Sequence, residues 1–200
     1  NGNVDFRIDV DLKNQEDKTA LMMAVQKALF PVVEVLLNKV ENIDEEDLIG
    51  RTALMTAIES HEMHLFRYLI NKGADVMHQD EAGNTPLMLA STHAQFDMVT
   101  ELIKKGVDLN EQNEKGETAL MKAVQVDAHS VVTELINAGA DLNIEDYSGL
   151  TALSWAITGG KIGIAEQLLE NGCKTDDQGG HSSLIWVVLG NYVSLVSSLT

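Results

Sequence analysis

The chain has 200 residues, of which 44% are hydrophobic, so it can bury a substantial core. Only 4% of residues are aromatic, and that core must therefore be aliphatic. The 14 Lys and Arg are outnumbered by 31 Asp and Glu, and the formal charge of −17 argues against binding to duplex DNA or an anionic membrane unless the few cations cluster. Cys173 is the only cysteine, which excludes an internal disulfide and is compatible with a reducing compartment.

A phrase of the form Thr-Ala-Leu-Met recurs at a fixed interval of 33 residues. Its copies begin at Thr19, Thr52, Thr85, Thr118 and Thr151, and a divergent sixth begins at Ser182. A period of this length indicates a stacked repeat array. Such arrays present an extended surface rather than an enclosed reaction pocket.

The repeat pattern divides the whole chain. We predict repeats over residues 14–46, 47–79, 80–112, 113–145 and 146–176, preceded by the tail of a preceding or capping repeat (1–13) and followed by a partial sixth repeat (177–200). All of these form one domain. Because the first residues enter the pattern part-way, the simplest interpretation is a piece of a longer protein, and a mature chain after signal cleavage is the alternative.

The unit 113–145 illustrates the predicted local structure. The polar residues around Gly116 predict a turn, and Thr118 is placed to cap a helix whose apolar face carries Leu120. Further apolar residues at helical spacing, from Val131 to Ile136, predict a second helix that ends at Gly139. Neither helix can bury its apolar face alone, so neighbouring units must stack.

These motifs carry a family resemblance. The turn and cap Asp80-Glu81-Ala82-Gly83-Asn84-Thr85-Pro86-Leu87 and the ending Gly139-Ala140-Asp141-Leu142-Asn143 resemble the ankyrin repeat family, and the likeness extends over roughly residues 9–200. It implies an all-α repeat solenoid of stacked helix-turn-helix units with β-hairpin fingers, with about five full repeats and partial ends. It also implies protein–protein recognition through the concave face.

The chain departs from the family at two positions. Only Pro86 follows its capping Thr, where the family usually has Pro, and Met22, Met55, Met88 and Met121 stand where the family usually has His. Met replaces the hydrogen bonds of that His with adaptable apolar packing, so a more deformable stack is our hypothesis. We interpret the Met row as a packing seam, and a metal-binding or oxidation-sensing ladder is the alternative.

No motif indicates catalysis or a cofactor. The segment from His61 to His64 lacks the spacing of a zinc-protease helix, and the acidic run 44–47 lacks the central Gly of a calcium loop. We therefore predict no catalytic residue, no cofactor and no metal. The acidic run is interpreted as a solvated hairpin tip, with electrostatic steering of a basic partner as the alternative.

Partner-binding residues are predicted at the fingers and at the exposed ends of the first helices, where residue identity varies between repeats. They are Leu48, Ile49, Arg51, Glu59, Glu81, Asn84, His93, Glu114, Lys115, Glu117, Gln125, Tyr147, Leu150, Trp155 and His181. Tyr147, Trp155 and the pair Leu48-Ile49 are the expected anchors. Packing between neighbouring repeats or fingers is the alternative role for Trp155, Trp186 and the Leu48-Ile49 pair.

Residues 178–200 contain no Asp, Glu, Lys or Arg. The apolar stretch 184–199 is too short and interrupted for a membrane span, so we expect a sixth repeat whose outer side is covered by further chain, a second copy or a partner.

The favoured function is a protein–protein interaction module that binds a neutral or basic protein or peptide, without nucleic acid. The alternative is a regulatory or positioning domain of a larger multidomain enzyme or secreted effector. An intracellular location, cytoplasmic or nuclear, is favoured, and a secreted bacterial effector is the alternative. Asn110 and Asn143 resemble asparagines that are hydroxylated in some ankyrin proteins, which intact mass of the cellular protein would test.

Overall fold

The computed structural model describes residues 12–175, and within this range the chain forms ten α-helices and no strand. Chain contacts divide the protein into two compact units, one ending at Asp75 and the other beginning at Val76. Both units are built from helix pairs, and the predicted all-α arrangement of stacked helix-turn-helix repeats is confirmed.

The first unit contains two helix pairs. Helices α1 (Ala20–Gln26) and α2 (Phe30–Leu37) form the first pair, and α3 (Ala53–Glu59) and α4 (Met63–Asn71) form the second. Helix α1 packs against both α2 and α3, and α3 packs against α4. The first helices of the two pairs therefore form a continuous inner row.

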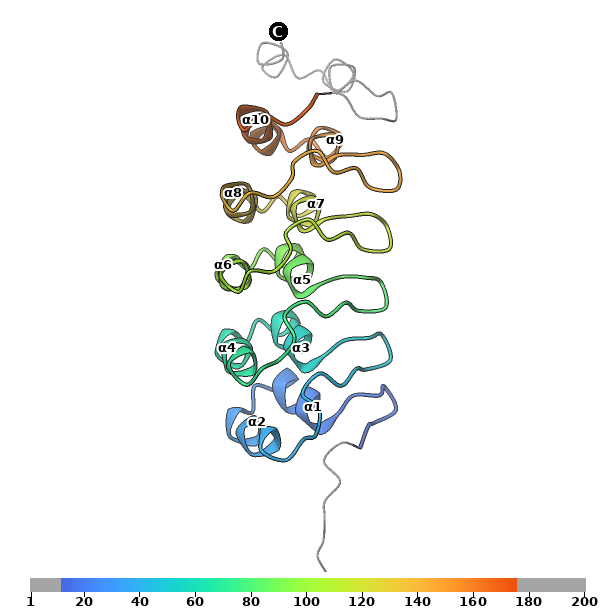
Figure 1. Ribbon diagram of the computed structural model, residues 1–200, viewed down its shortest axis with the longest axis vertical. Helices are drawn as coiled ribbons and strands as arrows, with labels where there is room; N and C mark the ends of the chain where they lie inside the picture. The colour runs from blue at the N-terminus through green and yellow to red at the C-terminus, as the bar shows by residue number, and fades with distance from the viewer. Residues whose placement is uncertain (1–11, 176–200) are drawn as a thin grey trace, which may run out of the picture. The chain divides into compact units, whose positions relative to one another are not determined.

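The second unit contains three helix pairs. They are α5 (Pro86–Thr92) with α6 (Phe96–Lys104), α7 (Ala119–Gln125) with α8 (His129–Asn137), and α9 (Ala152–Thr158) with α10 (Ile162–Glu170). Helix α7 packs against both α5 and α9, while α8 packs against both α6 and α10. Within each unit, polar loops project from the inner row on the side away from the outer row, as Figure 1 shows.

The repeated Thr begins each inner helix, as the sequence predicted. Its hydroxyl oxygen accepts a hydrogen bond from the backbone N–H three residues later, over 3.2–3.4 Å. This bond satisfies a backbone donor that a helix leaves unpaired in its first turn. The capping residues are Thr19, Thr52, Thr85, Thr118 and Thr151.

The outer helices α4, α6, α8 and α10 end at the repeated Gly, whereas Val40 stands at that position after α2. In α8, the residue after the last turn is Gly139, with a φ of 91°, and Ala140 donates its N–H to the Leu135 carbonyl over 3.0 Å. A residue with a side chain is strained in this left-handed conformation, so Gly is favoured as the helix end.

The core is aliphatic and repeats from pair to pair. The Leu of each capping phrase and the small Ala three residues later are buried in all five inner helices. The four Met of the seam are buried with them, and Ser154 occupies the corresponding place in α9. Close packing around the Ala positions brings neighbouring inner helices together.

Ser91 is the polar exception on the buried face of the inner helices. Its hydroxyl is buried and makes no hydrogen bond among the described residues. The residues at the same position in the other inner helices, Val25, Ile58, Val124 and Ile157, are apolar and buried. A buried hydroxyl without a partner costs free energy that an apolar side chain does not.

Ser91→Val is therefore expected to raise the free energy of unfolding by about 1–2 kcal/mol. Urea unfolding measures this change as a higher midpoint at unchanged slope. Ser91→Ala is the control that removes the hydroxyl without adding volume. A midpoint for Ser91→Val below that of the parent would show that the site has no room for the methyl groups.

Candidate functional site

The fingers are the polar loops that precede the inner helices, residues 47–51, 80–84, 113–117 and 146–150. In each finger the first side chain is Asp or Asn, and its Oδ1 accepts backbone N–H bonds from the residues two and four positions later. Such side-chain bonds hold a tight turn without a long ladder of strand pairing. Among the described residues, antiparallel bridges occur only as isolated pairs, Lys13 with Thr19 and Glu145 with Thr151, so the expected β-hairpins are not formed as regular strands.

Adjacent fingers are joined backbone to backbone within each unit. Leu48 donates its N–H to the Glu16 carbonyl over 3.2 Å in the first unit. In the second unit, Glu114 donates to the Ala82 carbonyl and Tyr147 donates to the Lys115 carbonyl, both over 3.0 Å. Each finger is thus held by its own turn and by its neighbour, which makes it a rigid support for its tip.

Several predicted partner-binding residues are exposed at the tips. Tyr147 is 75% exposed, Leu48 55% and Ile49 46%, although all three are large and apolar or aromatic. Glu81, Glu114 and Lys115 are exposed as well. Packing of Leu48 and Ile49 against a neighbouring finger would therefore cover only about half of each residue, and the other half is exposed.

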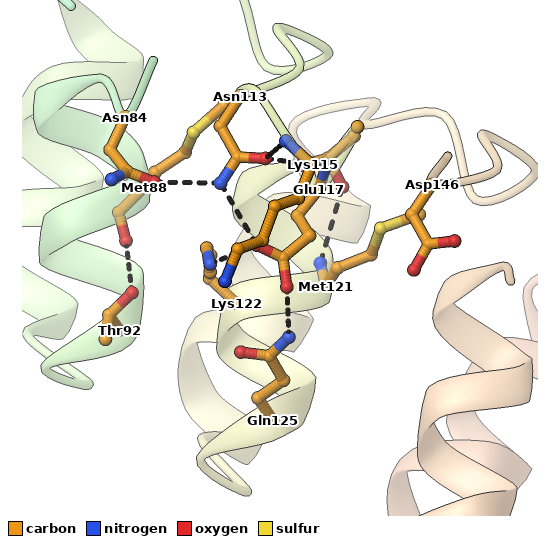
Figure 2. Close-up of polar contacts among 12 residues, drawn as sticks. Asn84, Met88, Thr92, Asn113, Lys115, Glu117, Met121, Lys122, Gln125 and Asp146 are labelled. Carbon is orange, nitrogen blue, oxygen red and sulfur yellow. Dashed lines mark hydrogen bonds and ion pairs between the residues drawn. The ribbon is translucent and has the colours of Figure 1, made fainter. Parts of the chain in front are cut away.

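A polar network connects two fingers of the second unit with α7. The Asn113 amide donates to Asn84 Oδ1 over 2.9 Å and to Glu117 Oε2 over 3.0 Å, as Figure 2 shows. The Glu117 carboxylate also accepts from Gln125 Nε2 over 2.8 Å and forms an ion pair with Lys122. The structure therefore brings together Asn84, Glu117 and Gln125 of the predicted set and adds Asn113 and Lys122, which were not predicted.

The chemistry of Asn explains its presence at position 113. An amide oxygen can accept the two N–H bonds of the finger turn, while the amide nitrogen donates to Glu117 and Asn84. A carboxylate, which stands at the same position in Asp47, Asp80 and Asp146, would instead face the Glu117 carboxylate. The sequence gives one indication of this network. Asn rather than Asp stands at position 113 in the finger that carries an acidic residue, Glu117, four positions later.

Glu117 is placed differently from most predicted partner-binding residues, because its side chain is buried at 6% exposure. Burial alone would raise the pKa of Glu117, but hydrogen bonds from Lys122, Asn113 and Gln125 and the charge of Lys122 lower it to about 2. Glu117 therefore stays ionised and fixes the finger to α7, rather than presenting its carboxylate at the surface.

Because the pKa of Glu117 is lowered in the folded state, its stabilising contribution is complete above the unfolded value of 4.5 and is lost as the pH falls toward about 2. Glu117→Gln is expected to lower the free energy of unfolding by about 1–3 kcal/mol at neutral pH and to flatten its fall across that acidic range. Urea unfolding at several pH values measures both effects. Glu114→Gln, at the exposed tip of the same finger, is the matched control. If the free energy of unfolding depends on pH equally in the two variants, the lowered pKa of Glu117 is contradicted.

The remaining predicted residues of the inner row take varied roles. Arg51, just before α3, forms an ion pair with Glu59, the last residue of α3, and both side chains are half-buried. Trp155 is half-buried on α9 and donates its Nε1–H to Asp146 Oδ2 over 2.9 Å. Leu150 is half-buried, His93 is exposed at the end of α5, and His181 lies outside the described residues.

A family model of ankyrin repeats in sets of three copies matches the chain at residues 3–80, 64–146, 87–179 and 128–200. The chain belongs to the ankyrin repeat family. No match to a curated protein was found. Ankyrin repeats are in general protein–protein interaction modules, and their fold is typically non-enzymatic.

In these ankyrin repeats, the two asparagines predicted as hydroxylation sites connect successive loops. Asn110 Oδ1 accepts the Asp141 N–H over 2.8 Å, and Asn143 Oδ1 accepts the Lys174 N–H over 2.6 Å. Asn110 is exposed and Asn143 is half-buried. Their hydroxylation stays a prediction.

Most residues of the acidic run 44–47 form hydrogen bonds or ion pairs within the protein. Asp44 Oδ1 accepts the Asp75 N–H over 3.0 Å, Glu45 pairs with Lys13 over 3.0 Å, and Asp47 holds its finger turn. Hydrogen bonds from Lys13 and Asn42 lower the pKa of Glu45. The run is therefore more constrained than the predicted solvated hairpin tip.

Residues 12–175 contain no set of three or more His, Cys, Asp or Glu side chains that could hold a metal ion. Burial raises the pKa of the Cys173 thiol to about 11, which keeps it protonated at neutral pH. No helix in this range is long and apolar enough to cross a membrane.

Proposed function

We propose that this chain binds a partner protein or peptide through its finger tips and the exposed faces of its inner helices. The observation that carries the proposal is the contrast between a repeated, buried framework and varied, exposed tips. An aromatic ring held at 75% exposure on a rigid finger contributes little to the fold and is well suited to contact another molecule.

Tyr147 is the strongest candidate anchor. Its backbone N–H is bonded to the Lys115 carbonyl over 3.0 Å, and its ring lies against Gly116, since an ideal Cβ on that glycine would stand 2.7 Å from Cδ1. The ring is therefore supported at its base and exposed beyond it. A contact residue held in place before binding loses less conformational entropy when a partner arrives.

Leu48 and Ile49 form the corresponding apolar tip in the first unit, on a finger joined to residue Glu16. Acidic residues dominate the chain, with 31 Asp and Glu against 14 Lys and Arg. We therefore infer a neutral or basic partner, whose association rate falls as salt concentration rises. We propose no catalytic role for the module itself.

The proposal predicts that Tyr147→Ala weakens binding of the partner by at least roughly tenfold, which corresponds to about 1.4 kcal/mol. A partner is first captured with the parent chain, and its dissociation constant is then measured by calorimetry for each variant. Phe96→Ala is the matched control, because Phe96 is an exposed aromatic on the outer helix α6 of the same unit. Equal losses for the two variants, or none for either, would reject Tyr147 as an anchor.

A further inference from the structure

A hollow of about 410 Å³ lies between the C-terminal parts of α7 and α9. Its lining residues are Val124, Gln125, Trp155, Thr158, Gly159 and Lys161. The volume falls at the small end of the range that ligand sites in proteins occupy. The hollow therefore has room for a large side chain of another molecule.

Gly159 accounts for the hollow. The same position at the end of the other inner helices carries a side chain in Lys27, Ser60, His93 and Val126. A Cβ on Gly159 would stand 3.0 Å from the Trp155 carbonyl oxygen, 3.5 Å from Cγ of Lys161 and 3.7 Å from Cε of Lys161, so a larger side chain there would extend over the Lys161 stem. Because Gly has no side chain, the space beside that stem remains open.

Trp155 gives the hollow its apolar character. The indole N–H is bonded to Asp146 Oδ2 over 2.9 Å, and Asp146 Oδ1 is held by the N–H groups of Ser148 and Leu150 over 2.8 and 3.0 Å. The polar edge of the ring is thus satisfied by the finger, and the ring surface that lines the hollow has no polar atom to offer. Such a surface favours an aliphatic or aromatic occupant.

Lys161 lines the hollow, and the Asp127 carboxylate lies beside it. Lys161 Nζ is 3.7 Å from Asp127 Oδ2, and His129 Nε2 is 3.8 Å from Asp127 Oδ1. These are long contacts between partly exposed groups, which contribute little energy and leave the Asp127 carboxylate accessible to a further cation. Asp127 and the acidic excess of the whole chain favour a partner with a positive charge next to its apolar group.

We propose that this hollow receives a bulky apolar side chain of a protein partner in which Lys or Arg stands beside that anchor. This inference rests on the proposed binding function and assigns it a specific pocket and partner chemistry. The Trp155 ring contacts the anchor, Gly159 provides the space, and Asp127 pairs with the neighbouring cation.

The test uses the full chain as bait for a display library of random peptides. Peptides that carry an aromatic or large aliphatic residue next to Lys or Arg are expected to be enriched. Their affinity is expected to fall at least roughly tenfold for Gly159→Val, which narrows the hollow, and severalfold for Asp127→Asn. Ser60→Val places the same side chain at the end of α3 and is expected to leave the affinity unchanged.

Gly159→Val is expected to fold after a small local shift at the Trp155 carbonyl oxygen, which would stand 3.0 Å from the added Cβ, because Gly159 has an ordinary φ of −82° and Val126 occupies the same position in α7. Circular dichroism and the unfolding midpoint check this point, and Trp155→Phe provides a second variant that alters the wall without filling the space. Peptides that bind the parent and Gly159→Val equally, enrichment of acidic peptides, or no enrichment at all would each overturn the inference. If the selected peptides weaken with Tyr147→Ala but not with Gly159→Val, the hollow is rejected while the binding function stands.

Discussion

Replacing Leu120 by Ala is expected to lower the free energy of unfolding by about 2–5 kcal/mol. Leu120 is 1% exposed on α7, and α7 is packed between α5 and α9. The substitution removes buried methyl groups and leaves a cavity that helices on both sides can only partly close. Denaturant unfolding followed by circular dichroism measures the loss.

Val126→Ala is the matched control for Leu120→Ala. Val126 is an exposed aliphatic residue immediately after the same helix, so its truncation opens no cavity. Its effect is expected to stay within about 0.5 kcal/mol. A loss for Leu120→Ala no larger than that of the control would show that α7 is not held between two neighbours.

Gly116→Ala is expected to destabilise the protein by roughly 2–5 kcal/mol, combining the cost of a left-handed residue with that of a steric overlap. Gly116 has a φ of 76°, and an added Cβ would stand 2.6 Å from the backbone nitrogen of Tyr147. Backbone cannot move aside as a flexible side chain can, so the bond between Tyr147 and the Lys115 carbonyl must be displaced. Thermal and denaturant unfolding measure the loss.

Gly139→Ala separates the two contributions. Gly139 has a similar φ of 91°, but nothing lies within 4 Å of an added Cβ. Its substitution therefore reports the conformational cost alone, about 1–2 kcal/mol. If the two variants lose equal free energy of unfolding, the overlap at Gly116 costs little, which would mean that the fingers separate readily. Gly116→Ala should in addition weaken partner binding if Tyr147 is the anchor, because the ring lies against this glycine.

The sequence predicted the framework well because its causes are local or periodic. Thr118 lies three residues from the N–H it caps, and Gly139 comes one residue after the C-cap Ala138 of α8. The burial of the four Met residues follows the prediction from their constant spacing, because equivalent residues of a repeat take equivalent places in the core. Each of these features can be found by comparing one copy of the repeat with the next.

The candidate site was harder to predict because it arises where copies differ. Glu117 was expected at the surface by analogy with Arg51, Asn84 and Leu150, yet it is buried. Its environment depends on Lys122 and Gln125, which α7 places beside it, and on an amide at position 113 instead of a carboxylate. None of these differences between repeats is sufficient by itself to predict the network.

The amino-acid sequence by itself determined the repeat period, the capped inner helices, the glycine-ended outer helices and the family, because each follows from chemistry within a few residues or from a constant spacing. Only the tertiary structure decided which variable side chains are exposed and which are held in hydrogen bonds within the protein. It alone showed the hollow beside Trp155. The physical reason is that the hollow results from a missing side chain at Gly159 between two packed helices. Such a space belongs to the packing of neighbours, and it becomes visible only when the neighbours are in place.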